Sequence, residues 1–213
     1  MDMKIRSARG DDAAFLAWLI LTAGRAEGKR GIWEVVLNEP EDKCLSFLEV
    51  LSVTQRPHLF HHSCYLVAEV EGRPVAGLGG YDPDVLGYPS LRKALPEAFG
   101  KVQMHPTDEM KGRGSPGILE CIPASFKGAW VIDSVATAGE FRRKGIANSL
   151  LGAILEKGRR LGFRIAQINI YIGNRAAQEA YEKQGFKIVD EKRDPYFERE
   201  VGFPGMARML CEL

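Results

Sequence analysis

Residues 130–147 read WVIDSVATAGEFRRKGIA, and this stretch decides the fold. Its first part, Trp130–Thr137, is rich in apolar and β-branched residues and predicts a strand. A short turn, Ala138–Phe141, leads into the basic run Arg142–Ala147. Apolar residues then recur at helical spacing, which predicts a helix over Gly145–Leu161. The stretch is therefore a strand, a basic glycine turn and a helix.

The basic glycine turn suits a phosphate group. The first N–H groups of a helix have no intrahelical acceptor, and the helix dipole favours an anion there. Gly145 allows a ligand to approach the backbone, and Arg142 to Lys144 add positive charge. The phosphate-loop patterns GxxxxGK[ST] and GxGxxG are both absent. Taken alone, the turn also fits a basic helix start on the surface.

A second pattern follows one strand later. Residues Arg164–Ile172 alternate as a strand, and Asn174–Gln184 predicts a helix that Gly185 ends. Within NRAAQEAYEKQGF, residues 174–186, positions 174, 177 and 181 share one helix face, since they are spaced i, i+3 and i+7.

These two patterns, in this order, resemble the Gcn5-related N-acetyltransferase (GNAT) family. R-x-x-G-x-A over residues 142–147 is similar to the family's Q/R-x-x-G-x-G/A signature, and residues 174–186 look like its N-x-x-A-x-x-x-Y-x-x-x-G-F pattern. The resemblance is strongest over residues 129–191. It implies an α/β (α+β) fold with a mixed, mostly antiparallel central sheet and flanking helices. We expect one domain over residues 1–213, with an insertion at about 81–128 that the resemblance does not cover.

The resemblance implies acetyl-CoA as co-substrate and no metal. In the family, the pantetheine arm of the cofactor pairs with the strand that matches Trp130–Thr137. Its pyrophosphate binds to the turn that matches Arg142–Ala147, and the helix that matches Asn174–Gln184 makes further contacts. The residues implied to bind the cofactor are Val135, Ala136 and Thr137; Arg142, Arg143, Lys144, Gly145, Ile146 and Ala147; and Asn174, Ala177 and Tyr181.

The resemblance also implies catalytic residues. Tyr181 matches the tyrosine that protonates the departing thiolate, and a backbone N–H near Val135 is placed to stabilise the oxyanion. Asp133 is the first candidate for the base that deprotonates the amine, and Glu120 is the second. The alternatives are structural: Asp133 bonded to a loop or water, Tyr181 as a packing residue, and Asn174 as a plain helix N-cap.

The remainder of the chain predicts further elements of one mixed domain. The expected elements are a strand at 3–8 followed by a helix, a helix at 41–53, a hairpin at 64–80, and strands at 186–191 and 206–213. Residues 81–127 hold no sustained period, so they are expected to form a functional insertion or a mobile lid, with one short helix around 90–99.

Composition excludes several function classes. The formal net charge is +1, so we expect no nucleic-acid and no membrane partner. No apolar run approaches the ~18 residues that span a bilayer. The four cysteines form no CxxC pair and are expected to be reduced thiols, mostly buried, in a cytoplasmic protein.

Two groups of residues are expected to have ordinary roles. His58, His61 and His62 lack acidic or cysteine neighbours at metal-ligand spacing, so they predict a surface or partly buried cluster. Trp18 and Trp33 are expected to pack in the core, although relatives place part of the acceptor pocket in this region.

Three functions remain open. The first is an N-acetyltransferase for a primary amine on a small molecule, and the second is a protein or peptide N-acetyltransferase. The third is a non-catalytic acyl-CoA-binding module, since a fold does not by itself imply a function. The oligomeric state is open as well, with a homodimer among the alternatives.

Overall fold

A central sheet organises the chain in the computed structural model, which describes residues 2–108 and 117–213. Within these residues the sheet has seven strands in the order β1-β2-β3-β4-β5-β7-β6. Only β4 and β5 are parallel; every other neighbouring pair is antiparallel. The strands are β1 Met3–Ser7, β2 Tyr65–Val70, β3 Arg73–Tyr81, β4 Ala129–Thr137, β5 Ile165–Tyr171, β6 Lys187–Arg193 and β7 Gly205–Glu212. The predicted fold class is confirmed.

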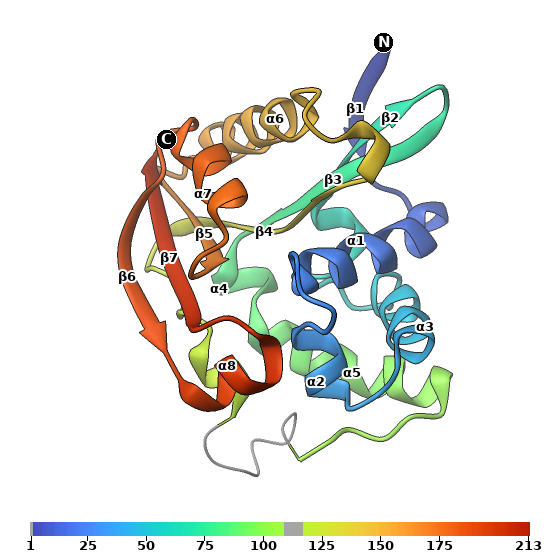
Figure 1. Ribbon diagram of the computed structural model, residues 1–213. Helices are drawn as coiled ribbons and strands as arrows, with labels where there is room; N and C mark the ends of the chain where they lie inside the picture. The colour runs from blue at the N-terminus through green and yellow to red at the C-terminus, as the bar shows by residue number, and fades with distance from the viewer. Residues whose placement is uncertain (1, 109–116) are drawn as a thin grey trace.

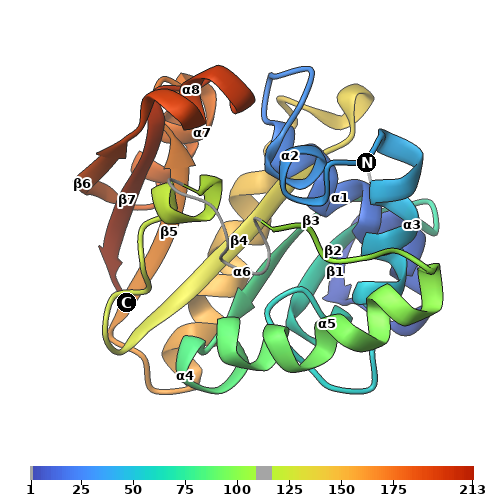
Figure 2. The same ribbon diagram turned by 90° about the horizontal axis from the view of Figure 1, so that it is seen from below.

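Helices cover both faces of this sheet. Figure 1 shows α6 and α7 on one face, with α1, α3 and α5 on the other. Figure 2 shows β4 passing between that second helical layer and the half of the sheet formed by β5, β7 and β6. The helices are α1 Ala13–Arg25, α2 Ile32–Leu37, α3 Glu41–Leu51, α4 Pro83–Leu86, α5 Tyr88–Val102, α6 Ile146–Arg160, α7 Arg175–Glu182 and α8 Pro195–Val201.

The strands bury both of their faces because each face meets its own helices. Successive side chains of a strand point to opposite sides. Tyr65 and Val67 of β2 therefore join the core under α1 and α3, while Leu66 and Ala68 join the core under α6. This explains why β2 reads as an almost continuous apolar run.

The pairing of β4 changes halfway along its length. Its register with β5 ends at Ile132, opposite Ile168, and beyond that point β4 pairs with β3 alone. At the same place β4 has a bulge: Asp133 lies opposite Gly79 and Ala136 opposite Gly77, so two residues of β4 face one of β3. Among residues 2–108 and 117–213, the carboxyl half of β4 therefore has no paired strand on its β5 side.

The short helix expected around residues 90–99 is confirmed, and the helical part of the insertion is longer than predicted, covering most of residues 83–102. They form α4 and α5, and α5 packs on α3 through four buried side chains at helical spacing: Leu91, Ala94, Ala98 and Phe99. Two prolines and several polar residues make the helical spacing of these apolar side chains hard to recognise in the sequence. Pro89 lies in the first turn, where it is tolerated, but Pro96 lies inside the helix. Residues 109–116 of the predicted insertion lie outside the described residues.

The expectation for the histidines is wrong for His58. Its side chain has no exposed surface, and its Nε2 lies 3.1 Å from the Thr54 hydroxyl and 3.2 Å from the Leu51 carbonyl oxygen. Burial lowers the pKa of His58 to about 4, so the ring is neutral at pH 7. His58 therefore fastens the turn after α3, where it replaces backbone partners that a helix end lacks.

Helix α8 was not predicted. Asp194 caps it by accepting a hydrogen bond from the Phe197 amide at 2.8 Å, and Gly202 ends it with φ of 86°. Phe197 and Val201 are buried in a third, smaller core that also contains Tyr171 of β5.

Two further findings bear on function. All four cysteines are buried and free, as expected. No helix in residues 2–108 and 117–213 is both long and apolar enough to cross a bilayer.

Phe99→Ala tests whether α5 is a structural helix. The Phe99 ring lies 4.8 Å from the Phe47 ring, so removing it leaves a cavity between α5 and α3. We expect the free energy of unfolding, from urea titration, to fall by about 3–5 kcal/mol. Val85→Ala is the control: Val85 is 62% exposed, and its loss should change stability by less than ~0.5 kcal/mol. A Phe99→Ala loss no larger than the control's would show that α5 is not part of the core.

Candidate active site

The break between β4 and β5 opens into a cavity of about 940 Å³. Its walls come from both halves of the molecule: β4, β5, the start of α6 and α7 on one side, and α1, α2 and α5 on the other. The cavity therefore connects the predicted phosphate turn with the helical layer below the sheet.

The turn before α6 has the geometry of an anion site. Gly145 is the N-cap of α6 in a left-handed conformation, φ 79°, and a Cβ built there would meet no atom within 4 Å. Arg143 is also left-handed, with φ 60°. The Nε of Arg142 donates to the Thr137 carbonyl at 3.2 Å, which fastens the turn to the end of β4. The open backbone, the exposed helix N-terminus and the adjacent cations fit the pyrophosphate of coenzyme A.

Nearly all the predicted cofactor residues line this one cavity. Those that line it are Val135, Ala136, Thr137, Arg142, Arg143, Gly145, Ile146, Ala147, Asn174, Ala177 and Tyr181. The exception is Lys144, whose ammonium lies 5.0 Å above the Phe141 ring and is not part of the wall. Its contribution there is limited to long-range charge.

Helix α7 carries Tyr181 into the cavity. Asn174 caps this helix by accepting a hydrogen bond from the Ala177 amide at 3.2 Å, and it also lines the cavity. Its two predicted roles, N-cap and cavity wall, therefore coexist. Tyr181 is buried, and burial together with the charge of Asp133 raises its pKa. Its hydroxyl group thus remains protonated at neutral pH and can donate a proton.

Asp133 is a carboxylate that lines the cavity. It lies where β4 leaves β5, beside Ser134, whose hydroxyl donates to it at 2.9 Å. Burial raises the pKa of Asp133, against the lowering effect of its hydrogen bonds with Ser134, and a raised pKa makes the carboxylate a stronger base. Desolvation, and after it the charge of Asp133, raises the pKa of each of five tyrosines: Tyr65, Tyr81, Tyr88, Tyr171 and Tyr181.

Glu120, the second candidate base, lies on a different wall. It belongs to the short 3-10 helix Ile118–Cys121 and is exposed at the cavity. Both candidate bases therefore border the same space, but Glu120 is exposed and Asp133 is less so. The charge of Asp133 also acts on Tyr181 of α7.

Aromatic and apolar side chains form the far wall. The rings of Trp33 and Phe60 meet edge to face at 5.0 Å, and both line the cavity. Trp33 therefore does more than fill the core, in contrast to Trp18, which packs on Phe15 at 5.3 Å away from the cavity. Helix α5 contributes Leu91 and Leu95 to the same cavity.

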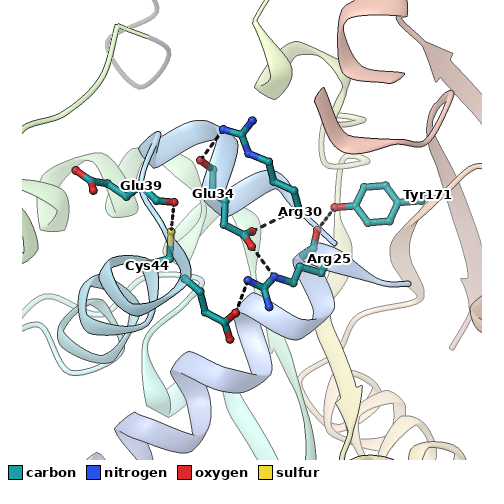
Figure 3. A network of polar contacts seen from close by, with 9 residues as sticks. Arg25, Arg30, Glu34, Glu39, Cys44 and Tyr171 are labelled. Carbon is teal, nitrogen blue, oxygen red and sulfur yellow. Dashed lines mark hydrogen bonds and ion pairs between the residues drawn. The ribbon is translucent and has the colours of Figure 1, made fainter. Parts of the chain in front are cut away.

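The position of Trp33 depends on a polar network shown in Figure 3. Glu34 accepts from the Arg25 Nε at 2.5 Å and from the Gly31 amide at 3.0 Å, so it joins the end of α1 to the start of α2. Arg25 also pairs with Glu41 at 2.9 Å. Glu34 is only 5% exposed, and in this paired state its burial is tolerated.

Tyr171 joins the two halves of the cavity. Its hydroxyl donates to the Gly24 carbonyl at 2.5 Å, across the gap between β5 and α1, and Figure 3 shows this contact. Its ring stacks on Phe203 at 4.6 Å.

Sequence reasoning missed several wall residues. Nothing in the sequence around Tyr171 predicts a role in the cavity, since a tyrosine at the end of a strand is common. The α5 residues do carry a signal, because Tyr88, Leu91, Arg92 and Leu95 are spaced i, i+3, i+4 and i+7 and so share one helix face.

Comparison with known proteins points to one family. The model of the family described as "Acetyltransferase (GNAT) family" matches residues 33–186. GCN5-related N-acetyltransferase 6, chloroplastic, from Arabidopsis thaliana is 37% identical over 59 residues, which are 28% of this chain and 20% of that protein. The match thus spans about a fifth of the length of that curated relative.

Solved structures share the architecture. An N-acetyltransferase from Staphylococcus aureus Mu50 superposes with a TM-score of 0.69 at 22% identity, covering 97% of this chain and 99% of that one. Another solved acetyltransferase gives a TM-score of 0.70 at 21% identity, with 98% of both chains covered. At such identities the likeness shows the fold.

Gly31→Ala tests how tightly the acceptor-side wall is built. A Cβ on Gly31 would lie 2.3 Å from the Gly24 carbonyl oxygen, so α2 would have to move away from α1. We expect a loss of about 1–3 kcal/mol in the free energy of unfolding. Gly100→Ala is the matched control, since a Cβ there meets nothing within 4 Å inside α5 and should stabilise by about 0.5–1 kcal/mol. Equal stability of the two variants would contradict the close contact.

Proposed function

The chain belongs to the acetyltransferase (GNAT) family, and from this premise we propose that it transfers the acetyl group of acetyl-CoA to a primary amine on a small molecule. The observation that carries this proposal is the single cavity that runs from the basic glycine turn, past Asp133 and Tyr181, to the wall formed by Trp33, Phe60 and α5. It offers room for a cofactor and an acceptor that meet at the break between β4 and β5.

Acetyl-CoA supplies an activated acetyl thioester. In our proposal the turn Arg142–Ala147 holds its pyrophosphate, and the free edge of β4, Val135–Thr137, holds its pantetheine arm. A backbone N–H near Val135 donates to the thioester carbonyl oxygen as negative charge develops there.

Two side chains move protons. An ammonium group cannot attack a carbonyl, so Asp133 accepts a proton from the acceptor amine. Tyr181 donates its hydroxyl proton to the departing sulfur. The raised pKa of Asp133 makes its carboxylate a stronger base than usual. The raised pKa of Tyr181 keeps its hydroxyl protonated until the sulfur leaves with its negative charge.

The shape of the acceptor side supports a small molecule over a peptide. Residues of α2, α5 and the turn Ile118–Cys121 wall the cavity from below. A peptide substrate would need a groove that continues past these elements. Peptide acetylation and a purely acyl-CoA-binding role are the alternatives that the experiments below distinguish.

Gly145→Glu tests cofactor binding. A carboxylate at the N-cap of α6 would lie where the pyrophosphate is proposed to bind. We expect the parent protein to bind acetyl-CoA in the micromolar range, roughly −8 kcal/mol by calorimetry, and the variant to show no binding. Gly152→Glu adds the same charge farther along α6, where a Cβ meets nothing within 4 Å, and should bind normally. Unchanged affinity in Gly145→Glu would show that the phosphate site is elsewhere.

Tyr181→Phe tests the proton donor. The ring and its packing remain, and only the hydroxyl is lost. We expect kcat to fall by ~10²–10⁴-fold with little change in acetyl-CoA affinity. A packing role would instead leave kcat unchanged and lower the melting temperature. Turnover on a confirmed acceptor, measured together with the cofactor Kd, separates the two.

Asp133→Asn and Glu120→Gln compare the candidate bases. Each variant removes one carboxylate and keeps its approximate shape. We expect Asp133→Asn to lower kcat by ~10²–10⁴-fold, and Glu120→Gln to lower it by less than about tenfold. The reverse order would transfer the base role to Glu120. A matched thermal melt shows whether either variant has lost its fold.

A further inference from the structure

We propose that the acceptor is a zwitterionic amine: a primary amine attached to an apolar body that also carries a carboxylate. This inference rests on the proposed function and identifies the class of substrate for the same cavity. Three features of the wall carry it: an apolar surface, an unpaired cation, and a carboxylate at the reacting end.

The apolar surface selects the body of the acceptor. Leu91 and Leu95 of α5 line the cavity, as does the edge-to-face pair of Trp33 and Phe60. Ile20 of α1 lines it as well. These side chains cannot hydrogen-bond a hydroxyl-rich or polycationic molecule, so such a substrate would lose water without compensation. An aliphatic or aromatic body gains free energy on burial there.

The cation selects a carboxylate. Arg92 lies on the same face of α5, one turn after Tyr88, and both line the cavity. Within residues 2–108 and 117–213, no acidic side chain forms an ion pair with Arg92. An exposed guanidinium at the edge of an apolar wall is suited to a bidentate contact with a carboxylate. It would repel a second ammonium group on a polyamine.

The amine end is drawn to Asp133. Tyr88, one turn before Arg92 on the same face of α5, lines the same cavity as Asp133. The remaining carboxylates that line the cavity are all exposed: Glu27, Glu120 and Glu179. The cavity thus has a negative reacting end, an apolar middle and a positive end on α5.

Matched pairs of amines test this polarity. Phenylalanine and 6-aminohexanoate carry the carboxylate, whereas phenethylamine and pentylamine are the same molecules without it. Each is titrated calorimetrically into the protein saturated with coenzyme A, and each is assayed for acetylation, with spermidine and kanamycin as polar references. We expect at least one carboxylate-bearing member to bind and to react at least ~10-fold better, in kcat/KM, than its partner and than both references.

Variants then identify the residue responsible. Arg92→Gln should abolish the preference for the carboxylate within a pair and leave the plain amine unaffected. Lys93→Gln removes the same charge from the next position, which is exposed and does not line the cavity, and should preserve the preference. Leu95→Ser should weaken the binding of both amines of a pair by the same factor.

Three outcomes would overturn the inference: faster turnover of spermidine or kanamycin, equal turnover within both pairs, or acetyl-CoA binding with no acetylation of any carboxylate-bearing amine. A preference that survives in Arg92→Gln would overturn the role of Arg92. The proposed function fails separately, in the cofactor titration: a protein that does not bind acetyl-CoA is not the acetyltransferase proposed, whatever it does with these amines.

Discussion

The end of the parallel pairing at Ile132 and Ile168 is the constraint on which the site depends. A continuous β4–β5 ladder would fill this region with backbone hydrogen bonds. The bulge at Ser134, with its left-handed φ of 53°, instead turns the carboxyl half of β4 away from β5. The free strand edge, the cavity and the position of Asp133 all follow from that one break.

Because no backbone hydrogen bonds join β4 to β5 in this region of the described chain, side-chain contacts connect the two sides of the cavity. Tyr171 bonds to Gly24 across the gap, and Glu34 joins the two helices that present Trp33. Because these contacts are buried, removing one partner would leave the other unsatisfied at a cost of about 1–3 kcal/mol. The cavity is thus bordered by fixed elements on both sides. Rigid walls of this kind favour preorganised binding.

Sequence patterns predicted the sheet half of the site well and the helical half poorly. The glycine turn and the Asn174 helix were recognisable because their chemistry is local: a left-handed glycine, a helix N-terminus and a face repeat. The hairpin of β2 and β3 and the positions of β4 and β5 also followed from turn residues and alternation. The bulge at Ser134 was not predictable, since serine has no local preference for it and tertiary pairing imposes it.

The full extent of α5, expected only around residues 90–99, and the whole of α8 were missed for physical reasons. Pro96 inside α5 reads as a helix breaker, although burial of Ala98 and Phe99 against α3 outweighs its cost. Helix α8 is short, and its burial depends on Tyr171, which is distant in sequence. Arg92 resembles any surface arginine until the fold places it beside the cavity. Long-range packing therefore decided which side chains face the acceptor.

A crystal structure of the protein with bound coenzyme A would test the central claim most directly. The account predicts that the pantetheine arm lies in the gap between the carboxyl halves of β4 and β5. It also predicts the pyrophosphate on the amides of residues 142–147 and the sulfur atom beside Tyr181. Coenzyme A bound elsewhere, or a β4–β5 ladder that closes over the gap, would contradict it.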